Sequence, residues 1–157
     1  MTIDIGLGKE NRKNVAEALK PFLADTYTLY LKTQNYHWNI TGPLFQPLHQ
    51  EFENQYKDLA EAADMVAEQI RALGFSSPGS YKSFSALTNI EEANDNEVIK
   101  ARDMIKTLAN DNETIVRSGS EALKIAQKAG DEVSADMLIE RMRKHEKTAW
   151  MLRSFEE

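Results

Sequence analysis

The sequence predicts an all-α protein: an antiparallel four-helix bundle with a short extra helix in its central connection. Apolar residues recur every three or four positions over four long segments, and no alternating strand pattern is apparent. All four prolines lie in the first half of the chain, which leaves the second half free of helix breakers. Four amphipathic helices can enclose one core, so residues 1–157 are expected to form a single domain, with residues 1–8 as an N-terminal tail.

The first two helices are expected to form an antiparallel hairpin. The first runs from about Lys9 to Tyr36, and Pro21 either kinks it or marks a short leading turn. The second runs from about Leu44 to Leu73, where Gly74 is the expected C-terminal stop. Only a few residues lie between the two helices, so they are expected to be neighbours.

The third and fourth helices are expected at about Asn94–Ala129 and Val133–Phe155, with a turn at Gly130-Asp131 between them. About twenty residues lie between the second and third helices. A structureless loop of that length is uncommon in a compact domain, so a short helix is expected near Tyr81–Leu87.

The composition excludes several kinds of function. The chain has 19 Lys and Arg against 25 Asp and Glu, and the net charge of 19 − 25 = −6 argues against nucleic-acid binding. The absence of cysteine excludes disulfides and Cys-based zinc or iron–sulfur sites. Neither a secretory signal nor an apolar run of about 18 residues is visible, so the cytoplasm is the expected location, with no membrane partner.

Two histidines and three carboxylates could form a metal site. His37 ends the first predicted helix and His49 opens the second, so the hairpin can bring them together. Glu53 follows His49 by four residues on the same helical face, and Asp64 and Glu68 form another i, i+4 pair. Imidazole and carboxylate together suit Fe(II), Mn(II) or Zn(II). No Glu-x-x-His motif occurs, which argues against a di-iron site inside one bundle.

The spacing of these residues requires two chains to complete one site. His49 and Asp64 are fifteen residues apart on one predicted helix, a separation of about 22 Å along its axis. At about 100° per residue the candidate ligands nevertheless share one flank of the apolar stripe, with Ala60 and Ala67 between them. Small residues there would let another helix approach closely.

A second copy packed antiparallel across a two-fold axis would place the histidines of one chain beside Asp64 and Glu68 of the other. The residues alone leave a simpler interpretation open. An acidic i, i+4 pair is also typical of a solvated helix face, and a histidine at a helix end is also typical of a cap or a packed residue.

Several stretches carry a resemblance to a known family. They are Asn35–Ile40, Gly42–Phe45, Leu48-His49, Asp64–Gly74, Gly130–Glu132 and Glu146–Leu152. In these stretches, and in the gap-free spacing of His37, His49, Asp64 and Glu68, the chain resembles the Dps family of mini-ferritins, within the ferritin-like superfamily. The resemblance covers essentially the whole chain.

The resemblance implies a ferroxidase that uses iron and assembles from two-fold dimers into a hollow dodecamer. It would oxidise Fe(II), preferably with hydrogen peroxide, and store Fe(III) mineral, which protects the cell from oxidative damage. His37 and His49 of one subunit, with Asp64 and Glu68 of its mate, would be the catalytic iron ligands. Glu53 stands where the family often has Asp, and this difference bears on the second iron position.

The resemblance implies two further roles. Trp38 is similar to family tryptophans near the site that take up oxidising equivalents. Asp131, Asp136 and Glu140 resemble acidic residues that line three-fold pores and attract cations. The alternative for these acids is a helix N-terminus with favourable negative charge.

DNA binding is not expected, because the basic tail that family members use for it is missing. Twelve copies at −6 each would carry −72, which opposes a polyanion. Two alternatives to the ferroxidase remain: a DNA-compacting stress protein, and a metal-independent helical scaffold in which the interface histidines are structural.

The other aromatic and basic positions suggest packing rather than chemistry. Helical spacing places Tyr27, Tyr30, Phe52, Met142 and Trp150 in the expected core. His145 lies within a basic run, and it is expected at the surface.

Overall fold

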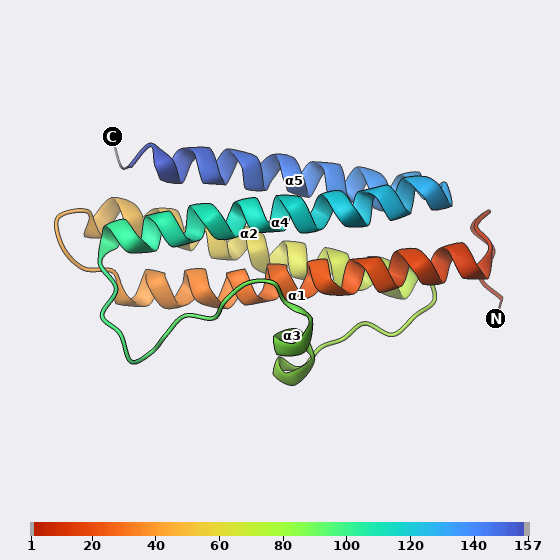
Figure 1. The fold of residues 1–157 in the computed structure, drawn as a ribbon, viewed down its shortest axis with the longest axis horizontal. Helices are drawn as coiled ribbons and strands as arrows, with labels where there is room; N and C mark the ends of the chain where they lie inside the picture. Colours follow the sequence, from red (N-terminus) through yellow and green to blue (C-terminus); the bar gives the residue numbers. More distant parts are fainter. Residues whose placement is uncertain (1, 156–157) are drawn as a thin grey trace.

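The computed structural model describes residues 2–155, which form five helices and no strand (Figure 1). They are α1 (Lys9–Asn39), α2 (Phe45–Ala72), α3 (Tyr81–Leu87), α4 (Ala101–Ala129) and α5 (Glu132–Arg153). The predicted all-α bundle with a short central helix is confirmed. Within this part of the chain, no helix is both long enough and apolar enough to cross a membrane.

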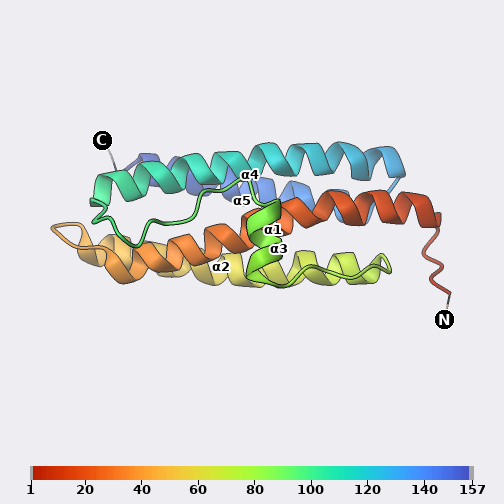
Figure 2. The ribbon, with the colours of Figure 1, turned by 60° about the horizontal axis from the view of Figure 1, so that its bottom comes forward.

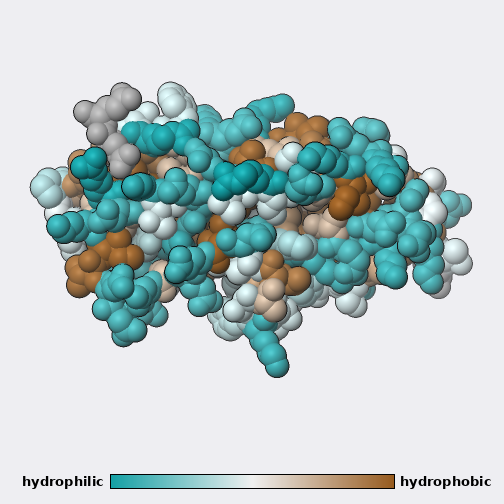
Figure 3. Space-filling view, viewed as in Figure 1, coloured by the Kyte–Doolittle hydropathy of each residue, from teal (hydrophilic) through white to brown (hydrophobic). Residues whose placement is uncertain are grey.

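The four long helices lie side by side, and α3 lies across the flank of α1 (Figure 2). The colours in Figure 1 show that α2 and α4 run in the same direction, so the connection between them must return along the bundle. The core consists of aliphatic and aromatic residues from all five helices. Hydrophilic residues predominate on the face seen in Figure 3, between scattered apolar ones.

A buried carboxylate fixes the long connection to α1. Asp25 is fully buried and accepts hydrogen bonds from Thr88 Oγ1 at 2.9 Å and from the backbone N–H of Asn89 at 2.6 Å. Further along, Lys32 Nζ donates to the carbonyl oxygen of Glu91 at 2.7 Å. The connection is therefore held by charge-assisted hydrogen bonds, which are stronger than neutral ones.

Helices α1 and α4 differ from the prediction. Helix α1 continues through Pro21 without dividing, because buried residues on both sides, such as Leu19 and Phe22, hold it against the core. Helix α4 begins at Ala101 rather than near Asn94. The Asn94 side chain accepts a hydrogen bond from the backbone N–H of Asn96 at 3.1 Å, and such an Asx turn competes with helix formation.

The predicted places of His145 and Trp150 were wrong. The buried face of α5 includes Leu138, Arg141 and His145, in steps of three and four residues, so His145 is only 2% exposed. Its Nδ1 lies 2.7 Å from Oδ1 of Asn112 on α4. Trp150 falls outside this face and is 60% exposed. The prediction for His145 relied on the surrounding basic residues rather than on its position in the helical period.

The burial of His145 predicts a pH-dependent stability. Burial lowers the pKa of His145 from 6.5 to about 3, and the nearby charge of Arg141 adds to this effect. The unfolded chain therefore binds a proton below pH 6.5 that the native protein does not bind until about pH 3. Stability is fully present above this window, and acidification through it should cost up to about 1.4 kcal/mol per pH unit.

The measurement is urea unfolding at several pH values between 7 and 4, with the variant His145→Gln as comparison. Glutamine does not titrate and can still donate a hydrogen bond to Asn112. The slope of its free energy of unfolding against pH should be smaller than that of the wild type by the value for one bound proton, about 1.4 kcal/mol per pH unit. Equal slopes for the two proteins would show that protonation of His145 does not cause the pH dependence of stability.

Candidate functional site

The hairpin between α1 and α2 brings His37 and His49 into direct contact. Their rings stack with centroids 3.8 Å apart and an angle of 18° between the planes. Phe45 also stacks against His49, at 5.0 Å, and the ring of Tyr56 meets His37 edge-on at 5.2 Å. His37 is buried and His49 is partly buried. The predicted meeting of the two histidines is thus present within one chain.

Reciprocal hydrogen bonds fix the orientation of both rings. His37 Nδ1 lies 2.7 Å from the carbonyl oxygen of His49, and His49 Nδ1 lies 2.8 Å from the carbonyl oxygen of His37. A carbonyl only accepts, so each Nδ1 must carry the proton and donate it. In the neutral tautomer this leaves a lone pair on each Nε2, which is the form that binds metals.

Glu53 lies beside the two histidines but is held by a cation of its own helix. Lys57 Nζ is 2.6 Å from Oε1 of Glu53. This hydrogen bond and the charge of Lys57 hold the pKa of the Glu53 carboxyl below its ordinary value, with smaller contributions from His37 and His49. The carboxylate is therefore ionised at neutral pH and is already paired with an ammonium group.

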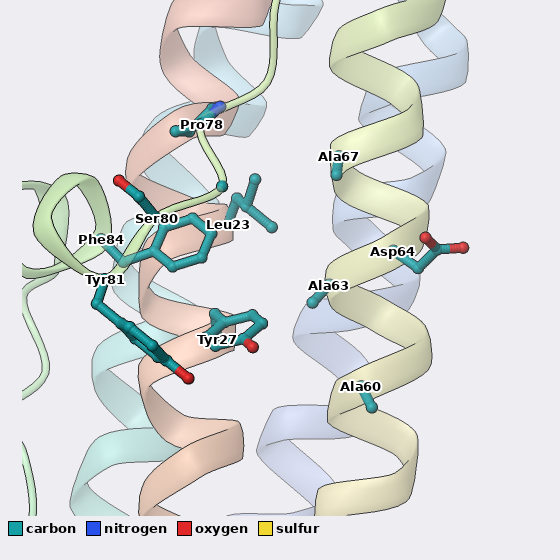
Figure 4. A pocket seen from close by; sticks show the side chains of 11 residues that line it. Leu23, Tyr27, Ala60, Ala63, Asp64, Ala67, Pro78, Ser80, Tyr81 and Phe84 are labelled. Carbon is teal, nitrogen blue, oxygen red and sulfur yellow. The ribbon is translucent and has the colours of Figure 1, made fainter.

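Asp64 and Glu68 are both exposed on α2, further along the helix from the histidines. Asp64 borders a groove of about 470 Å³ between α2 and the side formed by α1 and α3. In Figure 4, Ala63 and Ala67 point toward Leu23 across this groove, while the carboxylate of Asp64 points away from it. The two small residues predicted on this flank, Ala60 and Ala67, both border the groove, and the carboxylates of Asp64 and Glu68 are exposed.

One chain does not bring the whole predicted set together. Among residues 2–155, no three His, Asp or Glu side chains lie close enough to hold a metal ion. His49 and Asp64 are fifteen residues apart on the single helix α2, so the two positions are about 22 Å apart. The histidine pair and the acidic pair are therefore two half-sites at different levels of one face.

The other predicted residues lie apart from these half-sites or at their edge. Asp131 is buried and caps α5, because its carboxylate accepts hydrogen bonds from the backbone N–H and the hydroxyl of Ser134 at 3.0 and 2.6 Å. The capping alternative therefore applies to Asp131. Asp136 and Glu140 are exposed, and their role in lining a pore stays a prediction. Trp38 is 62% exposed next to His37.

The sequence analysis did not predict the contact of Tyr56 with His37. Tyr56 contacts His37 and lies near Tyr30, whose ring in turn meets Tyr27 edge-on. Tyr27 and Tyr30 were predicted to be core residues from their helical spacing, yet both are only partly buried, as is Tyr56. The one signal for this contact was that the tyrosines lie on α1 and α2, which the hairpin makes neighbours.

Comparisons with known proteins agree with this architecture. The ferritin-like domain family matches residues 16–157. A low temperature-induced protein of Nostoc sp., itself uncharacterised, is 40% identical over 98% of this chain and 86% of its own length. The DNA protection during starvation protein 2 of Bacillus anthracis is 35% identical over 91% of this chain and 97% of its own length.

Solved structures show the same similarity. A Dps protein from Vibrio cholerae O1, described as a member of a broad superfamily of ferritin-like diiron-carboxylate proteins, superposes with a TM-score of 0.92. It is 29% identical, and the alignment covers 100% of this chain and 98% of that one. A Dps protein from Bacillus brevis gives a TM-score of 0.89 at 33% identity, over 94% and 98% of the two chains. With its bundle, its short central helix and these relatives, the chain belongs to the Dps branch of the ferritin-like family.

Proposed function

We propose that the protein is a ferroxidase and iron-storage protein whose active sites form between two copies of the chain. The observation that carries the proposal is the pair of Nδ1–H to carbonyl hydrogen bonds between His37 and His49. They leave two Nε2 lone pairs on one half-site, while Asp64 and Glu68 stay exposed on the other. Imidazole nitrogen with carboxylate oxygen is a donor set that suits Fe(II).

A two-fold axis across α2 would join the half-sites. The groove beside Ala60, Ala63 and Ala67 offers small side chains against which a second helix can pack closely. If the two α2 helices are antiparallel, the histidines of each chain lie at the level of the acids of its mate. Each isologous dimer then has two identical sites. Six such dimers would form the dodecamer that the family resemblance implies.

Fe(II) is the substrate, and hydrogen peroxide is the proposed oxidant. Two Fe(II) and one H₂O₂ with two protons give two Fe(III) and two H₂O, so both electrons that peroxide requires come from iron. Two metals that react together avoid the release of hydroxyl radical. The protein holds the imidazoles rigidly and supplies negative charge that favours the Fe(III) product. The product is proposed to move into the cavity of the assembly and accumulate there as mineral.

Glu53 is the candidate ligand for the second iron, and Lys57 competes with that iron. Replacing Lys57 with methionine removes the competing ammonium while keeping the aliphatic stem. An exposed i, i+4 ion pair is weak, so the affinity for a second metal should rise only about two- to threefold. Calorimetric titration with Fe(II) under anaerobic conditions measures this change. A lower affinity for the second metal in Lys57→Met would contradict the competition.

The relatives named for DNA protection do not require this chain to bind DNA. Oxidising Fe(II) with peroxide removes both reagents that damage DNA. A negative surface opposes direct contact with phosphates, so no mobility shift is expected at physiological salt. A shift that persists there would favour the alternative of a DNA-compacting protein.

The direct test of the proposal is Fe(II) oxidation by the purified assembly. Absorbance of Fe(III) after peroxide is added should rise faster than in a protein-free control, with one peroxide consumed for two Fe(II). A rate equal to that of the control would favour the metal-independent scaffold.

A further inference from the structure

A polar pocket of about 210 Å³ lies between α2 and α5, with Asn112 of α4 also in its lining. Asp58 borders this pocket, whereas Ala60 borders the groove of the proposed dimer interface. Two positions along a helix correspond to about 200° around its axis, so the pocket and the groove lie on opposite sides of α2. The pocket therefore shares no residue with the proposed iron ligands.

Two buried side chains of this pocket each have a nitrogen without a hydrogen-bond partner. Arg141 and His145 are four residues apart on α5, on one helical face, and each is only 2% exposed. Within residues 2–155, neither Nε of Arg141 nor Nε2 of His145 finds a partner. Unsatisfied buried polar atoms are costly and rare in folded proteins. Two of them in one pocket indicate a ligand that satisfies both.

The neighbouring hydrogen bonds fix what each nitrogen offers. Asn112 Nδ2 donates to the carbonyl oxygen of Leu108 at 2.8 Å, so Asn112 Oδ1 accepts the proton of His145 Nδ1 at 2.7 Å. Burial lowers the pKa of His145 to about 3, so at neutral pH its Nε2 carries a lone pair and only accepts. Arg141 Nη2 donates to Asp58 at 2.8 Å, which leaves Nε–H as a charged donor. The ligand must therefore accept one hydrogen bond and donate another.

The charge of the lining favours an anion. The pocket has three cationic side chains against two carboxylates, a net charge of 3 − 2 = +1: Arg141, Lys144 and Lys147, with Asp58 and Glu51. Both oxygens of Asp58 already accept hydrogen bonds, from Arg141 at 2.8 Å and from Lys144 at 2.7 Å. Lys147 takes no part in these pairs and is exposed, which leaves its ammonium group for a ligand.

We propose that this pocket binds inorganic phosphate as HPO₄²⁻. Its unprotonated oxygens accept hydrogen bonds from Arg141 Nε–H and from the ammonium group of Lys147, and its single P–OH donates to His145 Nε2. Sulfate has a similar shape and the same charge but no proton at neutral pH, so it would place an oxygen lone pair against that of Nε2. The phosphodiesters of DNA and of lipid headgroups also lack a P–OH. The chemistry of the pocket thus selects free phosphate.

The experiment is calorimetric titration of the intact, iron-free assembly with inorganic phosphate at pH 7, and with sulfate at equal ionic strength. One phosphate should bind per chain, and sulfate should bind at least about tenfold more weakly, because it leaves the buried acceptor unpaired. Arg141→Lys keeps a cation beside Asp58 but removes Nε–H, and it should weaken phosphate binding about tenfold or more.

A second variant tests the site at an exposed position, where folding is not at risk. Lys147→Met should weaken phosphate binding about three- to tenfold, because it removes one charge-assisted hydrogen bond. The matched control is Lys106→Met, which removes the same charge from an exposed position of α4 outside the pocket. Its affinity for phosphate should stay within about twofold of the wild type.

Three results would overturn the proposal. Equal affinities for phosphate and sulfate would show unselective attraction of anions to basic side chains. An equal loss in Lys106→Met and Lys147→Met would show that the charge acts from any position. No saturable binding of phosphate would show that water alone satisfies the two nitrogens. Because no iron is present in the titration, none of these results bears on the proposed ferroxidase.

Discussion

Replacing Asp64 with alanine should slow peroxide-driven Fe(II) oxidation by at least about 100-fold, as strongly as replacing His37 does, because both are proposed ligands of one iron. Within one chain Asp64 lies about 22 Å along α2 from His49, against which His37 stacks, so equal losses have no explanation inside a single protomer. Stopped-flow absorbance of Fe(III) measures the rate. Each variant must first show the circular dichroism and the assembly size of the wild type.

The matched control for Asp64→Ala is Glu61→Ala. Glu61 is another exposed acid of α2, three residues before Asp64, and it is not among the proposed iron ligands. Its loss removes the same charge from the same helix and should leave the rate within about twofold of wild type. If Asp64→Ala also kept the wild-type rate, the acidic half-site would be a solvated helix face and nothing more.

Replacing Ala60 with tryptophan should break the two-fold dimer. Ala60 borders the groove that is proposed to receive a second α2 helix, and a bulky ring there holds the helices apart. Overpacking costs about 1–3 kcal/mol at a packed contact, and the two-fold axis imposes it twice. The dissociation constant of the dimer should therefore rise by about 30-fold or more. Sedimentation velocity over a dilution series measures it.

The same substitution at Ala72 provides the comparison. Ala72 is exposed at the end of α2 and lies outside the groove. Ala72→Trp should assemble like the wild type, so a loss of assembly in both variants would point to general destabilisation. Normal assembly of Ala60→Trp would place the interface elsewhere.

The fold was predictable because its signals are local and repeated. The three-to-four periodicity defined all four long helices, and the twenty-residue connection required the helix that the structure has at Tyr81–Leu87. The errors arose where a side chain outweighed the pattern. The Asn94 side chain stabilises a turn, so α4 begins later in the sequence than predicted. His145 faces the core although it lies within a run of charged residues.

The sequence predicted that His37 and His49 meet, but not the geometry of their contact. Helix rise and helical angle were enough to separate His49 from Asp64 and to put both on one flank. The reciprocal hydrogen bonds of His37 and His49 depend on the path of the hairpin backbone, which no residue pattern encodes. The ion pair of Glu53 with Lys57 follows a simple i, i+4 rule that was not applied there.

The most direct test of the central claim is subunit complementation. One chain carries His37→Ala with His49→Ala, and the other carries Asp64→Ala with Glu68→Ala. Each homodimer lacks every site, whereas a mixed dimer combines all four defects in one site and leaves the other intact. After unfolding and random reassembly, half of the dimers are mixed, so the mixture should recover about a quarter of the wild-type Fe(II) oxidation rate. A mixture as inactive as its parents would show that no site is shared between two chains.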